Sequence, residues 1–323
     1  MGLKVIESDH IMGGTFSVQT WAINEREAAE FKKIIHEGLS LVHELENKLT
    51  DFRESPFHKI NQMAGREWVQ VDQETYNLIK KSIEISRQTK GAFDISYATI
   101  GQLWRGARKE SKVPDQKEIQ KRLAYVDYSL IQFKDETCEV FLPNELMRIG
   151  LGGIGKGYAV DKLYEILLAK GISNFLVSGS GDVRVHSSSD APRPWRLAIK
   201  NPFSREDKVA GHIELQNGSM ATSGDYINYL KNQKGEEKLH HILQTKTGMP
   251  AVDIASCTII SDETVRSDTM ATSVIAMKSE NGIRFMNQQE IFGVIIRTNG
   301  EVLLSRKAMS HFGENARNKK ATA

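Results

Sequence analysis

The 323-residue sequence predicts an α+β fold in which helices pack on mixed or antiparallel sheets. Long helical periodicities and short strand-like runs occur together, and some neighbouring runs are joined as hairpins, which favours this class over a doubly wound sheet. No repeat of fixed period appears. We expect residues 1–313 to form one domain, or two intimately packed subdomains, followed by a flexible basic tail over 314–323.

The first long helix is the most clearly marked element. Asn24 and, three residues later, Glu27 form a capping box, and apolar residues recur at helical spacing as far as about Leu49. A second helix should cover Gln73–Thr89, because apolar residues recur there and Gly91 provides a stop signal just beyond its end.

Short apolar runs and their flanking turns predict the other elements. These are strands at 15–22, 128–133, 137–142, 146–150, 174–177, 182–186, 195–199, 211–215 and 255–260, helices at 156–170 and 262–277, and a hairpin of 291–296 with 301–305 around Asn299-Gly300. The charged stretch 108–122 predicts a solvated insertion at the surface.

Composition excludes several classes of function. The formal net charge of +2, from 43 basic and 41 acidic residues, does not indicate nucleic-acid binding. No apolar run is long enough to predict a membrane span. Cys138 and Cys257 form no CxxC pair, so a disulfide framework and a zinc site are disfavoured. The first residues lack a secretory pattern, which predicts a cytoplasmic protein; the alternative is an exported protein whose signal this sequence lacks.

The glycine-rich run GLGGIGKG at Gly150–Gly157 matches two phosphate-binding patterns but fits neither context. A P-loop needs Ser or Thr where Gly157 stands. A dinucleotide fold needs an acidic residue about 20 positions on, and Asp182 is too far away. The run therefore indicates a phosphate-approaching turn with Lys156 as a positive contact, or glycines needed only for packing.

Three further clusters could carry chemistry. Asp268 and Thr272 are four apart on a predicted helix, so their oxygens share one face, as a Mg²⁺ site would need. The polar segments 222–226 and 240–250 could move protons or position a nucleophile. The segment 90–96 could line a slot for an aromatic ring. Each also has a structural explanation, as helix surface, hydrogen-bonded turn or core aromatic.

The order of these motifs resembles that of the FAD:protein FMN transferases, the ApbE-type flavin transferases. The matching segments are Met12-Gly13, the loop ending in Asn61, GAFD at Gly91–Asp94 followed by Trp104, GGIGKGYAVD at Gly152–Asp161, SGSGDVR at Ser178–Arg184, TSGDY at Thr222–Tyr226 with the HHI…TG.P segment after it, and SDTMAT at Ser267–Thr272. The resemblance covers Met12 to about Met277. It implies an ApbE-like, T-fold-like architecture and Mg²⁺-dependent transfer of FMN from FAD to a Thr or Ser hydroxyl of an acceptor flavoprotein, with release of AMP.

The same resemblance implies roles for individual residues. Metal ligands would be Asp268 and Thr272, with main-chain oxygens near Gly153 and Ala271. His241 would be closest to acid–base chemistry, with Asp225 as a helper. The residues that would contact FAD are Met12, Phe52, Ala92, Phe93, Asp94, Lys156 and the main chain near Leu243.

The sequence also departs from the family pattern, mainly around FAD. Phe52 stands near the usual stacking Tyr, Gly14 replaces the Thr of the MGT motif, Gly150 replaces an acidic residue, and Gln244-Thr245 replaces Asp-Pro. Two other readings therefore stay open: an FAD pyrophosphatase that gives FMN and AMP, and a flavin-binding protein without turnover. A nicotinamide-dependent dehydrogenase ranks below them.

Overall fold

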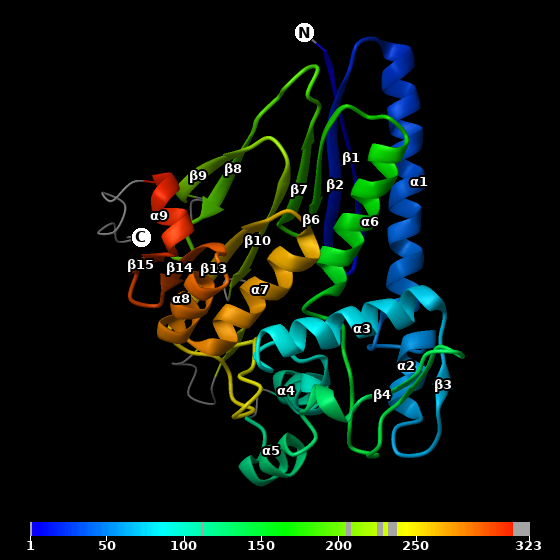
Figure 1. The fold of residues 1–323 in the computed structure, drawn as a ribbon, viewed down its shortest axis with the longest axis vertical. Coiled ribbons are helices and arrows are strands. Elements are labelled where there is room, and N and C mark those ends of the chain that lie inside the picture. Colours follow the sequence, from blue (N-terminus) through cyan, green and yellow to red (C-terminus); the bar gives the residue numbers. More distant parts are fainter. Residues whose placement is uncertain (1, 111–112, 205–207, 225–228, 232–237, 313–323) are drawn as a thin grey trace.

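The computed structural model describes residues 2–110, 113–204, 208–224, 229–231 and 238–312. Within these ranges the chain has the predicted α+β architecture (Figure 1). Eight described strands form the central sheet, and every neighbouring pair is antiparallel. Their order across the sheet is β1 (Leu3–Ile11), β2 (Gly14–Ala22), β6 (Asn174–Gly179), β7 (Asp182–Ser187), β10 (Gly218–Gly224), β13 (Ile254–Ser261), β14 (Phe292–Arg297) and β15 (Val302–Leu304).

Helices and smaller sheets complete the described fold. The helices are α1 (Glu25–Leu49), α2 (Pro56–Gln62), α3 (Gln73–Gln88), α4 (Ala98–Glu110), α5 (Gln116–Leu123), α6 (Gly155–Ala169), α7 (Thr264–Met277), α8 (Ser279–Gln288) and α9 (Arg306–Phe312), with short turns at Ile95–Tyr97 and Tyr128–Leu130. The smaller sheets are β3 (Val69–Gln70) and β4 (Gln132–Lys134) on either side of β5 (Glu139–Phe141), β8 (Trp195–Lys200) with β9 (Val209–Leu215), and β11 (Tyr229–Lys231) with β12 (Lys238–His240). None of the described helices has the length and apolar character needed to span a bilayer.

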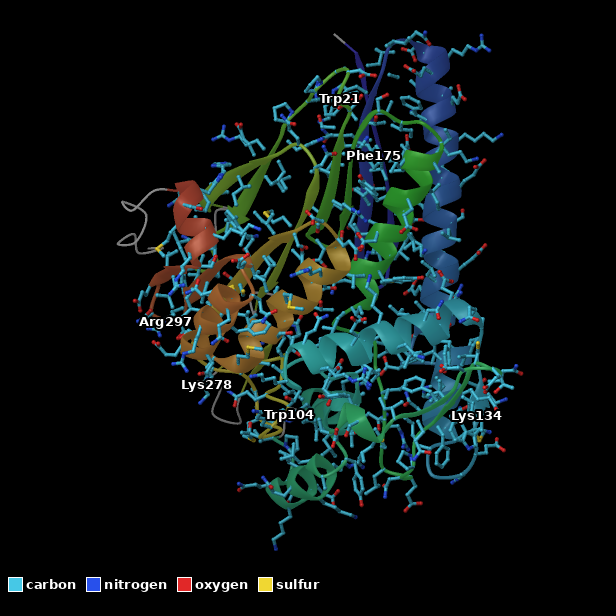
Figure 2. The ribbon with its side chains drawn as sticks, in the orientation of Figure 1. Trp21, Trp104, Lys134, Phe175, Lys278 and Arg297 are labelled. Carbon is cyan, nitrogen blue, oxygen red and sulfur yellow. The ribbon has the colours of Figure 1, made fainter. Side chains whose placement is uncertain are left out.

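Alternation along the strands divides the core between two faces of the central sheet. Phe175 and Val177 of β6 belong to the main apolar cluster, beneath α1 and α6. Leu176 lies between them in sequence and packs instead with the cluster under the β8–β9 hairpin and α9. Trp21 of β2 (Figure 2) packs against that second cluster. Its ring centroid lies 5.0 Å from that of Trp195 of β8.

The elements between α1 and α6 in sequence gather at one end of the central sheet, where α2 to α5 and the β3-β5-β4 sheet lie together (Figure 1). The chain returns from them through the glycine-rich run and enters α6. This path brings the start of α6 to the junction between the two parts of the molecule.

The best-marked sequence elements are confirmed. Asn24 caps α1 by accepting the N–H of Glu27 at 2.9 Å, which is one half of the predicted capping box. The Glu27 carboxylate reaches back one residue further than the motif requires and accepts the N–H of Ile23 in place of that of Asn24. After α3, Gly91 adopts a positive φ of 78°. The hairpin of β14 and β15 turns at Asn299-Gly300 as predicted.

The prediction of a strand over 146–150 is wrong. Ile149 donates its N–H to Asn61 Oδ1 and accepts a hydrogen bond from Asn61 Nδ2, both at 2.8 Å. Asn61 is only 2% exposed. A buried side-chain amide therefore satisfies the peptide groups that a neighbouring strand would otherwise pair.

The predicted solvated insertion over 108–122 is also wrong in part. The segment contains the end of α4 and most of α5, and Ile119 is 1% exposed. Ile119 packs with Ile100, Trp104 and Leu243 in a third apolar cluster. One apolar side chain among many charges anchors α5, which periodicity over so short a stretch does not reveal.

Several boundaries and elements differ from the sequence-based prediction. The predicted strand 128–133 starts with a helical turn, in which Asp127 accepts the N–H of Ser129 at 2.8 Å, and pairing begins only at Gln132. Strands β1, β3, β10, β11 and β12 and helices α2, α4, α5, α8 and α9 were not predicted. The predicted tail lies outside the described residues.

Candidate active site

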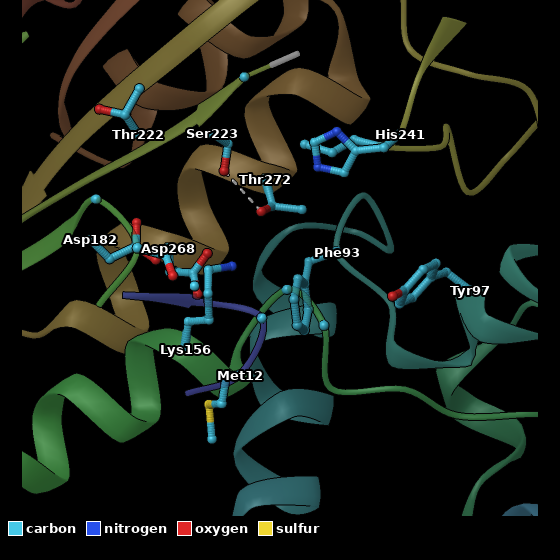
Figure 3. A pocket seen from close by; sticks show the side chains of 18 of the residues that line it. Met12, Phe93, Tyr97, Lys156, Asp182, Thr222, Ser223, His241, Asp268 and Thr272 are labelled. Carbon is cyan, nitrogen blue, oxygen red and sulfur yellow. Dashed lines mark hydrogen bonds between the residues drawn. The ribbon is translucent and has the colours of Figure 1, made fainter. Parts of the chain in front are cut away.

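A cavity of about 660 Å³ opens where strands of the central sheet meet α6 and α7. Segments from β2, β6, β7 and β10 line one side, and the other side comes from residues 92–97 and from residues 241–245 beyond β12 (Figure 3). A volume of this size suits a cofactor-sized ligand. The walls come from segments far apart in the sequence, so the cavity exists only in the folded chain.

Two tight hairpin turns form the part of the wall at the edge of the sheet. Met12 and Gly13 join β1 to β2 with φ of 53° and 75°, and Ser180 and Gly181 join β6 to β7 with φ of 57° and 102°. Positive φ at both central residues is what a type I′ turn requires. The Ser180 N–H donates to Thr15 O at 2.9 Å, which ties the two turns together.

The missing side chain at Gly14 is explained by its neighbour Ser180. A Cβ added to Gly14 would lie 1.8 Å from Ser180 Oγ and 2.9 Å from Ser180 Cβ. Both residues line the cavity. The Ser180 hydroxyl therefore occupies the space in which a threonine at position 14 would stand.

The glycine-rich run lets two helices approach closely. A Cβ on Gly157 would lie 2.8 Å from the carbonyl oxygen of Thr264 and 3.0 Å from Asp268 Cβ. The Gly157 N–H donates to Asp268 Oδ2 at 3.1 Å. This glycine joins the first turn of α6 to α7 and fixes the carboxylate of Asp268 at the cavity wall.

A second buried carboxylate positions the start of α7. Asp161, on α6, accepts the N–H of Thr264 at 2.8 Å and of Val265 at 2.9 Å. It also accepts a hydrogen bond from the Arg184 guanidinium at 2.8 Å. Since α7 has no side-chain cap of its own, Asp161 supplies one from the neighbouring helix.

Three charged side chains meet at the cavity wall: Lys156, Asp182 and Asp268 (Figure 3). Burial raises the pKa of Asp268, and the positive charge of Lys156 partly opposes this rise. Burial also raises the pKa of Asp182 well above its usual value, and the charge of Asp268 adds to the effect. The pKa of Lys156 is raised, chiefly by Asp268. Two carboxylates thus compete for one ammonium group.

Hydroxyl groups extend this polar wall. Asp268 and Thr272 both line the cavity from α7, one helical turn apart. Thr272 Oγ1 lies 3.2 Å from Ser223 Oγ on β10, within hydrogen-bonding distance. The neighbouring strand residue, Thr222, pairs its hydroxyl with that of Thr258 at 2.9 Å.

The opposite wall combines an aromatic ring, a carboxyl group and an imidazole. Phe93 is buried at the cavity, and Asp94 beside it accepts hydrogen bonds from the N–H groups of Ser96 and Tyr128. Burial raises the pKa of Asp94 to about 6 despite these bonds. The His241 ring lines the cavity and stacks on the His240 ring, with centroids 5.0 Å apart.

Comparison with known proteins decides the family. The model of the ApbE family matches residues 12–296, which is most of the sequence. The chain belongs to the ApbE family.

Relatives in the ApbE family carry a common name. The FAD:protein FMN transferase of Klebsiella pneumoniae (strain 342) is 28% identical over 299 residues, covering 91% of this chain and 90% of that protein. The FAD:protein FMN transferase of Vibrio cholerae is 28% identical over 285 residues, covering 87% and 83%.

Solved structures of ApbE proteins have the same fold. The ApbE protein of Thermotoga maritima superposes with a TM-score of 0.87 at 28% identity, covering 96% of this chain and all of that one. The flavin transferase ApbE of Vibrio cholerae superposes with a TM-score of 0.81 at 25% identity, covering 95% and 98%. The predicted ApbE-like architecture is therefore confirmed.

Most of the residues that the ApbE resemblance implies as functional lie at this cavity. The ones that line it are Met12, Ala92, Phe93, Asp94, Gly153, Lys156, His241, Leu243, Asp268 and Thr272. Their chemical roles remain predictions.

Two of the implied residues do not line the cavity, and for a third the structure gives no description. Phe52 is 75% exposed outside the cavity lining, with the Arg105 guanidinium 4.7 Å from its ring centroid. Ala271 is buried in α7 and does not line the cavity. Asp225 lies outside the described residues.

The structure also adds cavity residues to which the sequence assigned no role. They include the carboxylate of Asp182, together with Tyr97 and Ser180. Asp182 could have been noticed because it is an acidic residue directly after a Ser/Gly turn. No local pattern marks Tyr97, since its position depends on how the turn at Ile95–Tyr97 packs.

Proposed function

We propose that this chain is an FAD:protein FMN transferase that uses Mg²⁺ and moves FMN from FAD to a Thr or Ser hydroxyl of an acceptor flavoprotein, releasing AMP. The observation that carries the proposal is the composition of one cavity. It combines Asp268 and Thr272 for a cation, Lys156 for a phosphate and Phe93 for an aromatic ring. The names of the chain's ApbE relatives support the same activity.

The residues at the cavity fit Mg²⁺. A carboxylate and a hydroxyl one turn apart on α7 are hard oxygen donors, and Mg²⁺ commonly takes one or two carboxylates together with substrate phosphates. Among the described residues, no group of three or more His, Cys, Asp or Glu side chains could hold a metal ion. Main-chain oxygens near Gly153 and Ala271 would complete the set of ligands that the protein provides for the cation. When bound, Mg²⁺ would neutralise charge on the pyrophosphate.

FAD would be held by the walls on either side of the cation site. Lys156, at the start of α6, would contact the pyrophosphate, because an ammonium group and a helix N-terminus both favour negative charge. Met12, Ala92, Phe93, Asp94 and the main chain of Leu243 would contact the rest of the molecule. Phe52 could take part only if its side chain moved from its contact with Arg105.

The transfer step needs a group that accepts a proton. The acceptor hydroxyl oxygen would attack the phosphorus of the FMN half, the pyrophosphate P–O bond to AMP would break, and AMP would leave with the bridging oxygen. We assign the hydroxyl proton to His241, the imidazole at the cavity, because an imidazole titrates near neutral pH. Asp225 would assist it.

The test is to incubate the pure protein with FAD and Mg²⁺, with and without a Thr-containing acceptor, and to follow AMP and acceptor mass together. A mass gain of one FMN with Mg²⁺-dependent AMP release supports the transferase. AMP and free FMN without labelling would favour the pyrophosphatase, and no AMP would leave a flavin-binding protein.

Two variants locate the chemistry. Asp268→Ala should abolish Mg²⁺-dependent turnover and keep the fold, and full activity would refute the cation assignment. His241→Ala should slow transfer by about 10²–10⁴-fold and change FAD affinity far less. A loss confined to FAD binding would remove His241 from the proton transfer.

A further inference from the structure

Asp182 is a buried carboxylate at the cavity, and the proposed transferase chemistry gives it no role. It is the first residue of β7, directly after the turn formed by Ser180 and Gly181, and it is 4% exposed. Its side chain lines the cavity together with Asp268 and Lys156 (Figure 3).

One carboxylate oxygen of Asp182 has a structural partner and the other has none. The backbone N–H of Thr222 on β10 donates to the carboxyl group. The buried Oδ2 has no hydrogen-bond partner among the described residues. A buried carboxylate oxygen without a partner is costly, so a group that satisfies it is expected in the working protein.

The neighbouring charges indicate what that group is. Asp268 and Lys156 are the charged side chains that act most on Asp182. Two carboxylates and one ammonium group leave a net charge of −1 when all three are ionised. A divalent cation at this point would reverse the sign of the cluster and would prepare it to receive an anionic pyrophosphate.

We propose that Asp182 is a second carboxylate for the divalent cation, approaching from the sheet while Asp268 and Thr272 approach from α7. The inference rests on the proposed function for the cation itself and adds a residue to its site. Mg²⁺ sites built on one or two carboxylates are common, so a second carboxylate is within the usual range.

This role predicts that the carboxylate of Asp182 stabilises the protein only when a cation is present. Asp182→Asn keeps the size of the side chain and an oxygen for the Thr222 N–H but removes the charge. The variant should bind Mn²⁺, used as a probe, about 10–100-fold more weakly than the wild type. Without cation it should melt at the same temperature as the wild type or higher, because a buried carboxylate beside Asp268 is removed.

The measurement is Mn²⁺ binding by electron paramagnetic resonance, with Mn²⁺ alone and again with ADP present, together with thermal melting with and without Mn²⁺. Asp253→Asn is the matched control. Asp253 also has a buried side-chain oxygen, Oδ1, without a partner among the described residues, but it does not line the cavity. Its variant should bind Mn²⁺ like the wild type.

The outcomes separate this inference from the proposed function. If Asp268→Ala loses Mn²⁺ binding while Asp182→Asn binds normally, the role of Asp182 is refuted and the cation site on α7 stands. If the wild type binds no Mn²⁺, either alone or with ADP, the proposed cation site on α7 and the role of Asp182 are both refuted. A variant of Asp182 that melts lower without cation and binds Mn²⁺ normally would assign the carboxylate to the strand contact with Thr222 alone.

Discussion

Replacing Gly157 with alanine tests whether the close contact between α6 and α7 builds the site. The added Cβ would lie 2.8 Å from the Thr264 carbonyl oxygen, which is backbone and cannot rotate away, and 3.0 Å from Asp268 Cβ. The two helices must therefore move apart by several tenths of an ångström. Overpacking of this kind costs about 1–3 kcal/mol.

Gly155→Ala is the matched control, since it makes the same chemical change two residues earlier in the first turn of α6. The nearest atom to its added Cβ, Leu151 Cβ, is 3.9 Å away, an ordinary contact. Both variants gain helix propensity, by up to about 1 kcal/mol. We therefore expect Gly157→Ala to unfold with a free energy about 1–3 kcal/mol below that of Gly155→Ala.

The assay is urea unfolding followed by tryptophan fluorescence, with variants compared at equal slope. Gly157→Ala should also bind Mn²⁺ more weakly than Gly155→Ala, because the hydrogen bond from the residue-157 N–H to Asp268 Oδ2 would lengthen from 3.1 Å. Equal free energies of unfolding for the two variants would refute the packing explanation. Unequal stability with equal Mn²⁺ affinity would refute the link from packing to the cation site.

Three further predictions follow from buried groups around the cavity. Because burial raises the pKa of Asp94 to about 6 from an ordinary 3.8, the folded state holds this proton more tightly than the unfolded chain. The contribution of protonated Asp94 to the free energy of unfolding should be fully present below about pH 4. It should fall by roughly 3 kcal/mol as the pH rises through 6. Urea unfolding at several pH values should show this fall reduced in Asp94→Asn; identical pH profiles would contradict it. Gly14→Thr should lower the melting temperature by clashing with Ser180, and adding Ser180→Gly should recover most of the loss; an unchanged deficit in the double variant would place the strain elsewhere. Asp161→Ala should destabilise the fold by about 3–5 kcal/mol in urea unfolding, since it leaves the Arg184 guanidinium without its carboxylate and the first turn of α7 without its cap. A loss below about 1 kcal/mol would show that water replaces Asp161.

Local signals determined much of the secondary structure. The cap that Asn24 provides for α1, the apolar periodicity of α1 and the turn at Asn299-Gly300 act within a few residues, so sequence alone specifies them. The family motifs likewise located most of the cavity residues. The secondary-structure signals and the family motifs both consist of residues that are close together in the sequence.

Contacts between segments that are not neighbours in sequence could not be predicted from these local signals. The 146–150 run has the apolar character of a strand, yet its Ile149 peptide groups pair with the side chain of Asn61. Ile119 stands in a charged stretch, yet it is buried against Trp104 and Leu243. In each case the partner that decides the outcome lies far away in sequence.

The site shows the same division. The sequence alone pointed to Asp268, Thr272 and Lys156, because a helical spacing and a glycine-rich run mark them. Only the tertiary structure brought Asp182 to the same wall and set Ser180 over Gly14. Propensity, capping and periodicity act along a few residues of chain. Burial, repulsion between carboxylates and the space for a side chain depend on which distant segments pack together, so only the folded chain decides them.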